Sequence, residues 1–163
     1  ILQVGFTANK NIPKLAEAIK GLPCKLLIAG RADRTLISLL SANSIDYEIK
    51  DYLEQSEIIA LYRNADLVVF CSTYEGFGLP IIEAQASGKP VVTSDLSPMK
   101  DVGGGAVILV DPNDAADIRR GILQVIEDGE LREKLIRDGL ENVKRFDPKV
   151  IGKAYEDYYS KLV

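Results

Sequence analysis

The chain has 163 residues, of which 47% are hydrophobic and 27% are charged, with a formal net charge of −4. This length and composition fit one globular domain with its own core, and they exclude disorder, a collagen helix and a coiled coil. The lack of histidine excludes a Ser-His-Asp triad, a Cys-His pair and a histidine-built zinc site within this chain. Charges of alternating sign and a pI near 5.0 argue against duplex nucleic acid as the main partner.

Short apolar runs rich in β-branched residues predict six strands, at residues 1–5, 24–30, 45–50, 67–72, 90–94 and 106–110. Helical periodicity between most of these runs predicts helices at residues 11–21, 35–43, 55–64 and 79–87. Pro13 and Pro80 suit first turns, Ser56 suits an N-cap, and Gly21 and Gly88 suit helix ends. Alternating strands and helices indicate an α/β, doubly wound parallel sheet of six strands with helices on both faces.

After the sixth strand the alternation stops, and three consecutive helices are predicted at residues 113–128, 130–145 and 148–162. Tyr155, Tyr158 and Tyr159 form an aromatic stripe at helical spacing in the last of them. We expect this stripe to pack in the fold, and a ligand-stacking role is the alternative. The pattern contains no linker, so residues 1–163 are predicted to be a single domain.

Other features of the sequence bear on where the chain works. Cys24 and Cys71 lie in apolar runs and are expected to be small buried side chains without a disulfide. The apolar stretches are far shorter than the roughly 20 residues that cross a bilayer, and no signal peptide is visible. Because Met99 is the single methionine and the chain opens in a strand, we expect it to be a piece of a longer protein.

In a doubly wound sheet, ligands bind where the strands end and the strand order reverses. This rule directs attention to the loops at residues 5–11, 30–34, 50–53 and 72–80. The last loop is the most informative, because Gly76 and Gly78 flank an aromatic residue and Pro80 then begins a helix. Backbone amides left unpaired in such a turn form an anion site, and glycine lets the backbone approach a phosphate or a sugar closely.

Glu75 and Glu83 flank this turn and are expected to face the same opening. Taken singly, Glu83 could interact with the helix dipole and Glu75 could be a solvated loop charge. A carboxylate offers two acceptor oxygens that suit a vicinal diol, such as a ribose or a hexose, and cannot itself hold a phosphate. Two such carboxylates beside an amide-lined anion site therefore indicate a nucleotide sugar as the ligand.

The run EGFGLP at residues 75–80, with Glu83 and Ala84 after it and GKPVVTS at residues 88–94, resembles the signature of a known family. This family is the retaining glycosyltransferases of the GT-B fold, family 4, also called group 1. The resemblance covers nearly the whole chain and extends to ADLVVF at residues 65–70 and VDP at residues 110–112. It implies the C-terminal, Rossmann-like donor-binding half of such an enzyme, with the N-terminal acceptor domain absent from this chain.

The resemblance also implies roles for individual residues. Lys10 and Glu75 are expected to be the catalytic residues. Glu83 is expected to bind the ribose hydroxyls of the donor, and Glu75 the sugar and the adjoining phosphate. The turn of Gly76, Phe77, Gly78 and Leu79 would contact the sugar and the adjoining phosphate, and Lys10 would neutralise the departing diphosphate. Lys50, with the residues up to Leu53, and Arg31 are expected near the base, although Arg31, Lys50 and Tyr52 could simply be solvated loop residues.

The reaction that the resemblance implies is a front-face substitution with retention of configuration, in which the departing phosphate takes the acceptor's proton. It implies no cofactor, no metal and no nucleic-acid partner, and a sugar, lipid-linked or glycan acceptor bound through the absent domain. It places the protein in the cytoplasm, where the full-length enzyme could also lie at the inner face of a membrane. The isolated domain is expected to show no transfer.

One departure from the family pattern bears on this chemistry, because Phe6 stands where an arginine commonly follows the first strand. A domain that keeps the donor fold for binding or assembly, without transferase activity, is therefore the alternative. Other nucleotide-binding classes fit less well. Gly88-Lys89 is followed by Pro90 rather than Ser or Thr, which excludes a P-loop, and the first loop lacks the Gly-x-Gly-x-x-Gly of a dinucleotide enzyme.

Overall fold

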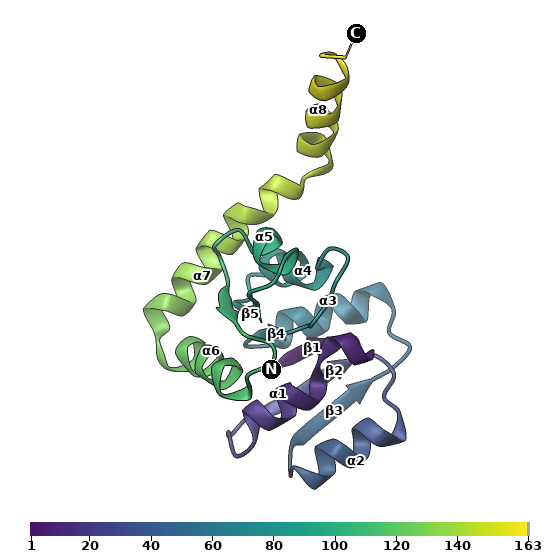
Figure 1. Cartoon of the computed structure of the whole chain (residues 1–163), viewed down its shortest axis with the longest axis vertical. Coiled ribbons are helices and arrows are strands. Elements are labelled where there is room, and N and C mark those ends of the chain that lie inside the picture. The colour runs from purple at the N-terminus through teal and green to yellow at the C-terminus, as the bar shows by residue number, and fades with distance from the viewer. Residues whose placement is uncertain (163) are drawn as a thin grey trace.

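A computed structural model describes residues 1–162 and has six strands, with helices between and after them (Figure 1). The strands are β1 (Leu2–Val4), β2 (Lys25–Ala29), β3 (Asp46–Lys50), β4 (Val68–Phe70), β5 (Val91–Ser94) and β6 (Ile108–Val110). The α-helices are α1 (Ile12–Ile19), α2 (Arg34–Ala42), α3 (Gln55–Asn64), α4 (Leu79–Ala86), α5 (Met99–Gly103), α6 (Ala115–Glu127), α7 (Gly129–Asn142) and α8 (Pro148–Tyr159). Two 3₁₀ turns, η1 (Ala8–Lys10) and η2 (Val143–Phe146), complete the chain.

The strands form one parallel sheet in the order β3-β2-β1-β4-β5-β6. In the register of the central strands, Leu2 of β1 lies opposite Leu27 of β2 and Val68 of β4. The chain builds outward from β1 in one direction and then, from β4, in the other. The predicted six-stranded, Rossmann-like sheet is therefore confirmed, and its switch point lies between β1 and β4.

Helices cover both faces of the sheet, which explains why the central strands β4 and β5 are buried at every residue rather than at alternate ones. On one face, α1, α2 and α6 bury side chains such as Leu15, Leu40 and Ile118. On the other, α3, α4 and α5 bury Tyr62, Ile81 and Met99. The edge strand β3 instead carries Asp46, Glu48 and Lys50 and is only partly buried, as expected for a strand edge protected from pairing with another chain.

The structure differs from the sequence-based expectation at several element ends. Helix α3 begins at Gln55, and the cap position is occupied by Glu54, not by Ser56, with the Glu54 N–H donating to the Glu57 carboxylate at 2.8 Å. The short elements η1 and α5 were not predicted, because three and five residues are too few for a periodic pattern to be recognised. None of the helices within residues 1–162 combines the length and apolarity needed to cross a bilayer.

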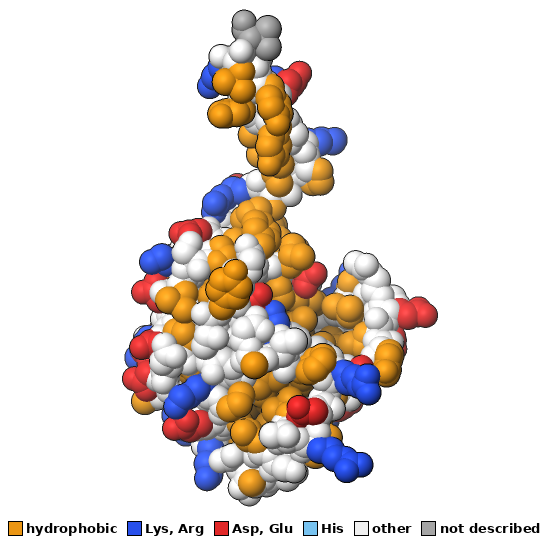
Figure 2. All heavy atoms as spheres, turned by 45° about the vertical axis from the view of Figure 1, so that its right-hand side comes forward, with side chains coloured by type: hydrophobic (Ala, Val, Ile, Leu, Met, Phe, Trp, Pro, Cys, Tyr) orange, Lys and Arg blue, Asp and Glu red, His pale blue; other side chains and the backbone are white. Residues whose placement is uncertain are grey.

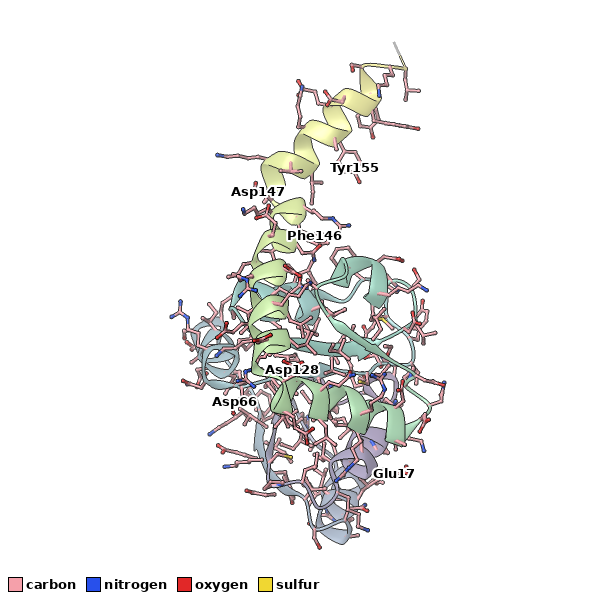
Figure 3. All side chains as sticks on the ribbon, turned by 90° about the vertical axis from the view of Figure 1, so that its left-hand side faces the viewer. Glu17, Asp66, Asp128, Phe146, Asp147 and Tyr155 are labelled. Atoms are coloured by element: carbon pink, nitrogen blue, oxygen red, sulfur yellow. The ribbon has the colours of Figure 1, made fainter. Side chains whose placement is uncertain are left out.

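The last helix, α8, projects away from the rest of the molecule (Figure 1). Phe146 and Asp147 lie at its base, and Tyr155 lies along its exposed length (Figure 3). Tyr155, Tyr158 and Tyr159 are between 60% and 62% exposed, and the rings of Tyr155 and Tyr159 stack on each other with centroids 6.4 Å apart. The expectation that the tyrosine stripe packs in the fold is therefore wrong, since α8 leaves the body and presents an apolar face to solvent (Figure 2).

Candidate functional site at the switch point

The loops that follow β1 and β4 are joined to each other where the strand order reverses. Asn9 connects them through its backbone carbonyl, which accepts from the Thr73 N–H at 2.9 Å, and through its Nδ2, which donates to the Tyr74 carbonyl at 2.8 Å. Nearby, Asn11 Nδ2 donates to the carbonyls of Cys71 and Pro112, at 3.1 and 2.6 Å. The bonds to Cys71 and Tyr74 cross 60 and 65 residues of sequence and hold the two loops beside each other, and the bond to Pro112 adds the segment that follows β6.

Within this frame, Lys10 and Glu75 form an ion pair. Lys10 Nζ lies 2.6 Å from Glu75 Oε1, and the side chains are only 16% and 13% exposed. Asn9 Nδ2 also donates to Glu75 Oε1, at 3.2 Å. The structure therefore brings together the two residues for which a catalytic role was predicted, and partial burial makes their charges interact more strongly than they would in water.

The path of the Lys10 side chain depends on Gly5. Gly5 has a φ of +86°, and a Cβ added there would lie 2.7 Å from Lys10 Cε. The backbone conformation therefore favours glycine, and any side chain at this position would displace the stem of Lys10. The Lys10 ammonium also lies 4.7 Å from the centroid of the Phe70 ring, a distance that allows a cation–π interaction.

The turn at residues 76–79 is open to solvent. Gly76 is exposed, Phe77 and Leu79 are 44% and 59% exposed, and Gly78 takes the N-cap position of α4 with a φ of +107°. No side chain caps this helix, and among residues 1–162 the N–H groups of 76–79 donate to no protein group. The amides of this turn are therefore unpaired, as the sequence predicted. Unpaired amides at the start of a helix attract anions, and the binding of an anion at this turn stays a prediction. The helix begins at Leu79, as predicted, and ends one residue earlier than expected, at Ala86.

Glu83 lies further along α4, and its hydrogen-bond partner comes from another helix. The hydroxyl of Tyr62, on α3, donates to Glu83 Oε2 at 2.6 Å. Burial, together with this hydrogen bond and the charge of Glu83, raises the pKa of the Tyr62 phenol, so the hydroxyl keeps its proton. Among the described residues no hydrogen bond joins Glu83 to Glu75 or Lys10. The two predicted carboxylates are therefore held by different partners, Glu83 by Tyr62 and Glu75 by Lys10.

The remaining predicted residues lie on the surface around the switch point. Arg31 is exposed and makes no ion pair within residues 1–162, whereas Lys50 pairs with Glu48 at 2.6 Å. Phe6 is 41% exposed and lies against Gly30, where an added Cβ would approach the Phe6 ring to 3.0 Å. Of the described residues, no group of three or more Cys, Asp or Glu is placed to hold a metal ion.

Two residues of this site were not identified from the sequence. Asn9 and Tyr62 contact the predicted carboxylates, yet Asn9 looked like an ordinary loop residue and Tyr62 like one member of an apolar helix stripe. The available signal for Tyr62 was chemical, because a tyrosine at a core position needs a partner for its hydroxyl. The identity of that partner depends on the packing of α3 against α4, which the local sequence does not specify.

The comparisons with known proteins agree on one family. Residues 1–141 match the family described as Glycosyl transferases group 1. O-antigen chain mannosyltransferase B of Escherichia coli is 35% identical over 149 residues, which are 85% of this chain and 39% of that protein. Capsular polysaccharide biosynthesis glycosyltransferase CapM of Staphylococcus aureus is 32% identical over 173 residues, covering 95% of this chain and 44% of that protein. The chain therefore spans less than half the length of these relatives.

Solved structures with the same fold include two that align with nearly the whole chain. Sucrose-phosphate synthase from Thermosynechococcus elongatus has a TM-score of 0.86 at 24% identity, covering 99% of this chain and 45% of that one. The Anabaena protein HepE, in complex with UDP and glucose, has a TM-score of 0.84 at 22% identity, covering 98% and 48%. At this level of identity the likeness shows the shared fold.

Proposed function

The chain belongs to the family Glycosyl transferases group 1, and from this premise we propose that it is the donor-binding half of a retaining, family 4 glycosyltransferase. It would bind a nucleotide-diphosphate sugar at the switch point of the sheet. The observation that supports this most directly is the position of Lys10, a partly buried cation beside a turn of unpaired amides. Together they offer positive charge and hydrogen-bond donors to a diphosphate.

In this proposal each group acts where charge changes during the transfer. Lys10 and the amides of residues 76–79 stabilise the negative charge that grows on the diphosphate as the sugar–oxygen bond breaks. The departing phosphate oxygen takes the proton of the acceptor hydroxyl, and the acceptor oxygen attacks the same face of the sugar, so the configuration is retained. Glu75 accepts from sugar hydroxyls, and Glu83 accepts from the ribose. Because protein groups meet the diphosphate charge, the proposed reaction calls for no metal ion.

The acceptor site would lie on a further domain, because the relatives are more than twice as long as the matched region. The relatives named for O-antigen chains and capsular polysaccharide support a glycan acceptor. The neighbour solved with UDP and glucose supports a nucleoside diphosphate as part of the donor. Arg31 and Lys50 stay predictions for the base, and a cytoplasmic location, with contact to a membrane surface only through the further domain, stays a prediction too.

A second candidate is a binding or assembly domain without transferase activity. The observation that favours it is Phe6, which leaves Lys10 without a second cation on the first loop. In this reading the donor fold is retained while the diphosphate clamp is incomplete. The two candidates differ in whether a nucleotide sugar binds.

Calorimetric titration with UDP-glucose, GDP-mannose and ADP-glucose tests the proposal. We expect one of the three to bind, and we expect Lys10→Ala to lower its affinity roughly 10- to 100-fold, since a hydrogen bond to a charged group contributes about 1.5–3 kcal/mol. Glu83→Ala should also weaken binding, and Lys25→Ala, at the opposite edge of the sheet, is the matched control. The chain alone should transfer no sugar to an acceptor.

Two results would contradict the proposal. Silence toward all three nucleotide sugars would favour the assembly domain. Turnover by residues 1–163 alone would show that the acceptor site does not need a further domain.

A further inference from the structure

Tyr62 is a buried side chain with one polar atom. It lies two residues before the end of α3, is 2% exposed, and packs among Phe70, Ile81 and Ala84 beneath the sheet. Its hydroxyl donates to Glu83 Oε2 at 2.6 Å, which is the one hydrogen bond of this hydroxyl within residues 1–162. The ring thus fills the core, and the hydroxyl reaches out of it to a carboxylate on the next helix.

Core packing alone does not account for this hydroxyl. A phenylalanine would fill the same space without the cost of burying a polar group, and the exposed Glu83 could be solvated by water without a partner. The hydroxyl is therefore useful to the carboxylate more than to the core. A buried donor in a fixed ring restricts a side chain that would otherwise sample many rotamers.

The hydrogen bond also determines which oxygen of Glu83 is left to accept a hydrogen bond from a ligand. It uses Oε2 and leaves Oε1 without a hydrogen-bond partner among the described residues. A carboxylate oriented in this way accepts hydrogen bonds and donates none, which suits a ligand with two neighbouring hydroxyl groups. Because burial raises the pKa of the Tyr62 phenol, the hydroxyl stays a donor throughout the neutral range.

We propose that Tyr62 is a positioning residue for the donor nucleotide: its hydroxyl holds Glu83 Oε2, so that Oε1 is presented to the vicinal hydroxyls of the ribose. This inference rests on the proposed function, in which Glu83 binds the ribose. It adds a residue on α3, outside the loops of the switch point, to the determinants of ribose recognition.

The test compares Tyr62→Phe with the wild type for two ligands. The first is the nucleoside diphosphate whose sugar conjugate binds, and the second is its 2′,3′-dideoxy analogue, which lacks both hydroxyls. We expect Tyr62→Phe to lose about fivefold to tenfold in affinity for the ribose ligand, as for one net hydrogen bond, and less than twofold for the dideoxy analogue. A purely structural role would lower both affinities by the same factor.

Companion variants separate this inference from the function on which it rests. Glu83→Ala should show the same ligand dependence with a larger ratio, and adding Tyr62→Phe to it should cause no further loss. Tyr47→Phe is the matched control, because the Tyr47 hydroxyl contacts Ser41 on α2 and not α4. Thermal melts followed by circular dichroism check that each variant is folded, and Tyr62→Met, which also fills the core, substitutes if Tyr62→Phe does not fold.

The outcomes are distinguishable. If Glu83→Ala discriminates between the two ligands and Tyr62→Phe does not, the positioning role is overturned and the proposed function stands. If neither variant discriminates, Glu83 does not read the ribose, and the positioning role fails with it. If both discriminate and the double variant equals Glu83→Ala, Tyr62 acts through Glu83 as proposed.

Discussion

The two edges of the sheet contrast in shape and in chemistry. Where the strands begin, at the amino edge, a cavity of about 750 Å³ opens between residues that include Cys24, Lys25, Asp66 and Arg132, and Asp66 is labelled on this side in Figure 3. A second hollow, of about 440 Å³, adjoins it beside Gly21. Where the strands end, at the carboxyl edge, lie the loops that hydrogen bonds join, the Lys10–Glu75 pair and the unpaired amides at the start of α4.

This contrast teaches that volume alone does not identify a binding site for a charged ligand. Helices α1 and α4 begin at the carboxyl edge and end at the amino edge, so the positive ends of their dipoles face the first and the negative ends face the second. The dipoles therefore favour an anion at the carboxyl edge, even though the hollows lie at the amino edge. The preference comes from the direction of the parallel strands, which sets the direction of every connecting helix.

The largest expected effects come from replacing two glycines, one at each edge of the sheet. Gly5 at the carboxyl edge and Gly21 at the amino edge have φ values of +86° and +75°, but only at Gly5 would an added Cβ meet another group. We expect Gly5→Ala and Gly21→Ala each to lower the free energy of unfolding by about 1–2 kcal/mol, because alanine is strained at positive φ. Gly5→Ala should in addition displace Lys10 and weaken nucleoside diphosphate binding. Urea unfolding and calorimetry measure the two effects.

Gly21→Ala serves as the control for the backbone strain itself. It should cost stability without changing ligand affinity. Wild-type affinity in a folded Gly5→Ala variant would mean that the position of Lys10 does not govern binding at the carboxyl edge.

Two ion pairs of equal length give a second comparison. Lys10–Glu75 and Lys25–Glu48 both have N···O distances of 2.6 Å, but the Lys25 and Glu48 side chains are 52% and 38% exposed. Double-mutant cycles with Lys→Met and Glu→Gln should give a coupling energy of about 1 kcal/mol for the first pair and a clearly smaller one for the second. Solvent and salt screen the exposed pair more, so 1 M NaCl should reduce its coupling further.

Equal coupling energies for the two pairs would contradict this expectation. Such a result would show that the loops at the carboxyl edge admit as much solvent as the open surface of the edge strand.

The smallest expected effect concerns the titration of Glu48. Hydrogen bonds from Lys25 and Lys50 lower the pKa of the Glu48 carboxyl to about 2. A pKa that is lower in the folded state than in the unfolded chain means that the stabilisation is present above about pH 4.5 and is lost as the pH falls toward 2. The carboxyl ¹³C shift, followed by NMR from pH 1.5 to 6, measures this directly. A midpoint near 4 at low salt would show that the lysines do not hold this carboxylate.

The strand and helix pattern could be predicted from the sequence because it rests on local periodicity and on punctuation by Gly and Pro. The same holds for the turn at residues 76–79, where Gly78 takes a positive φ. Short elements such as α5 could not be predicted, because one turn of helix is too short to show a periodic pattern. The prediction that the tyrosine stripe of α8 packs in the fold was wrong for a different reason. An apolar face shows that a helix can pack, but it does not show which surface it packs against.

By itself, the sequence determined the α/β class, the glycine-shaped turn and the candidate groups Lys10, Glu75 and Glu83, since these depend on residue type and on neighbours along the chain. Only the tertiary structure decided that Lys10 pairs with Glu75 across 65 residues and that Tyr62 holds Glu83 from another helix. Those contacts arise when β1 comes to lie beside β4 and α3 beside α4. Such pairing reflects the burial of whole helix and sheet faces, and a local run of residues carries no record of which side chains it brings within hydrogen-bonding distance.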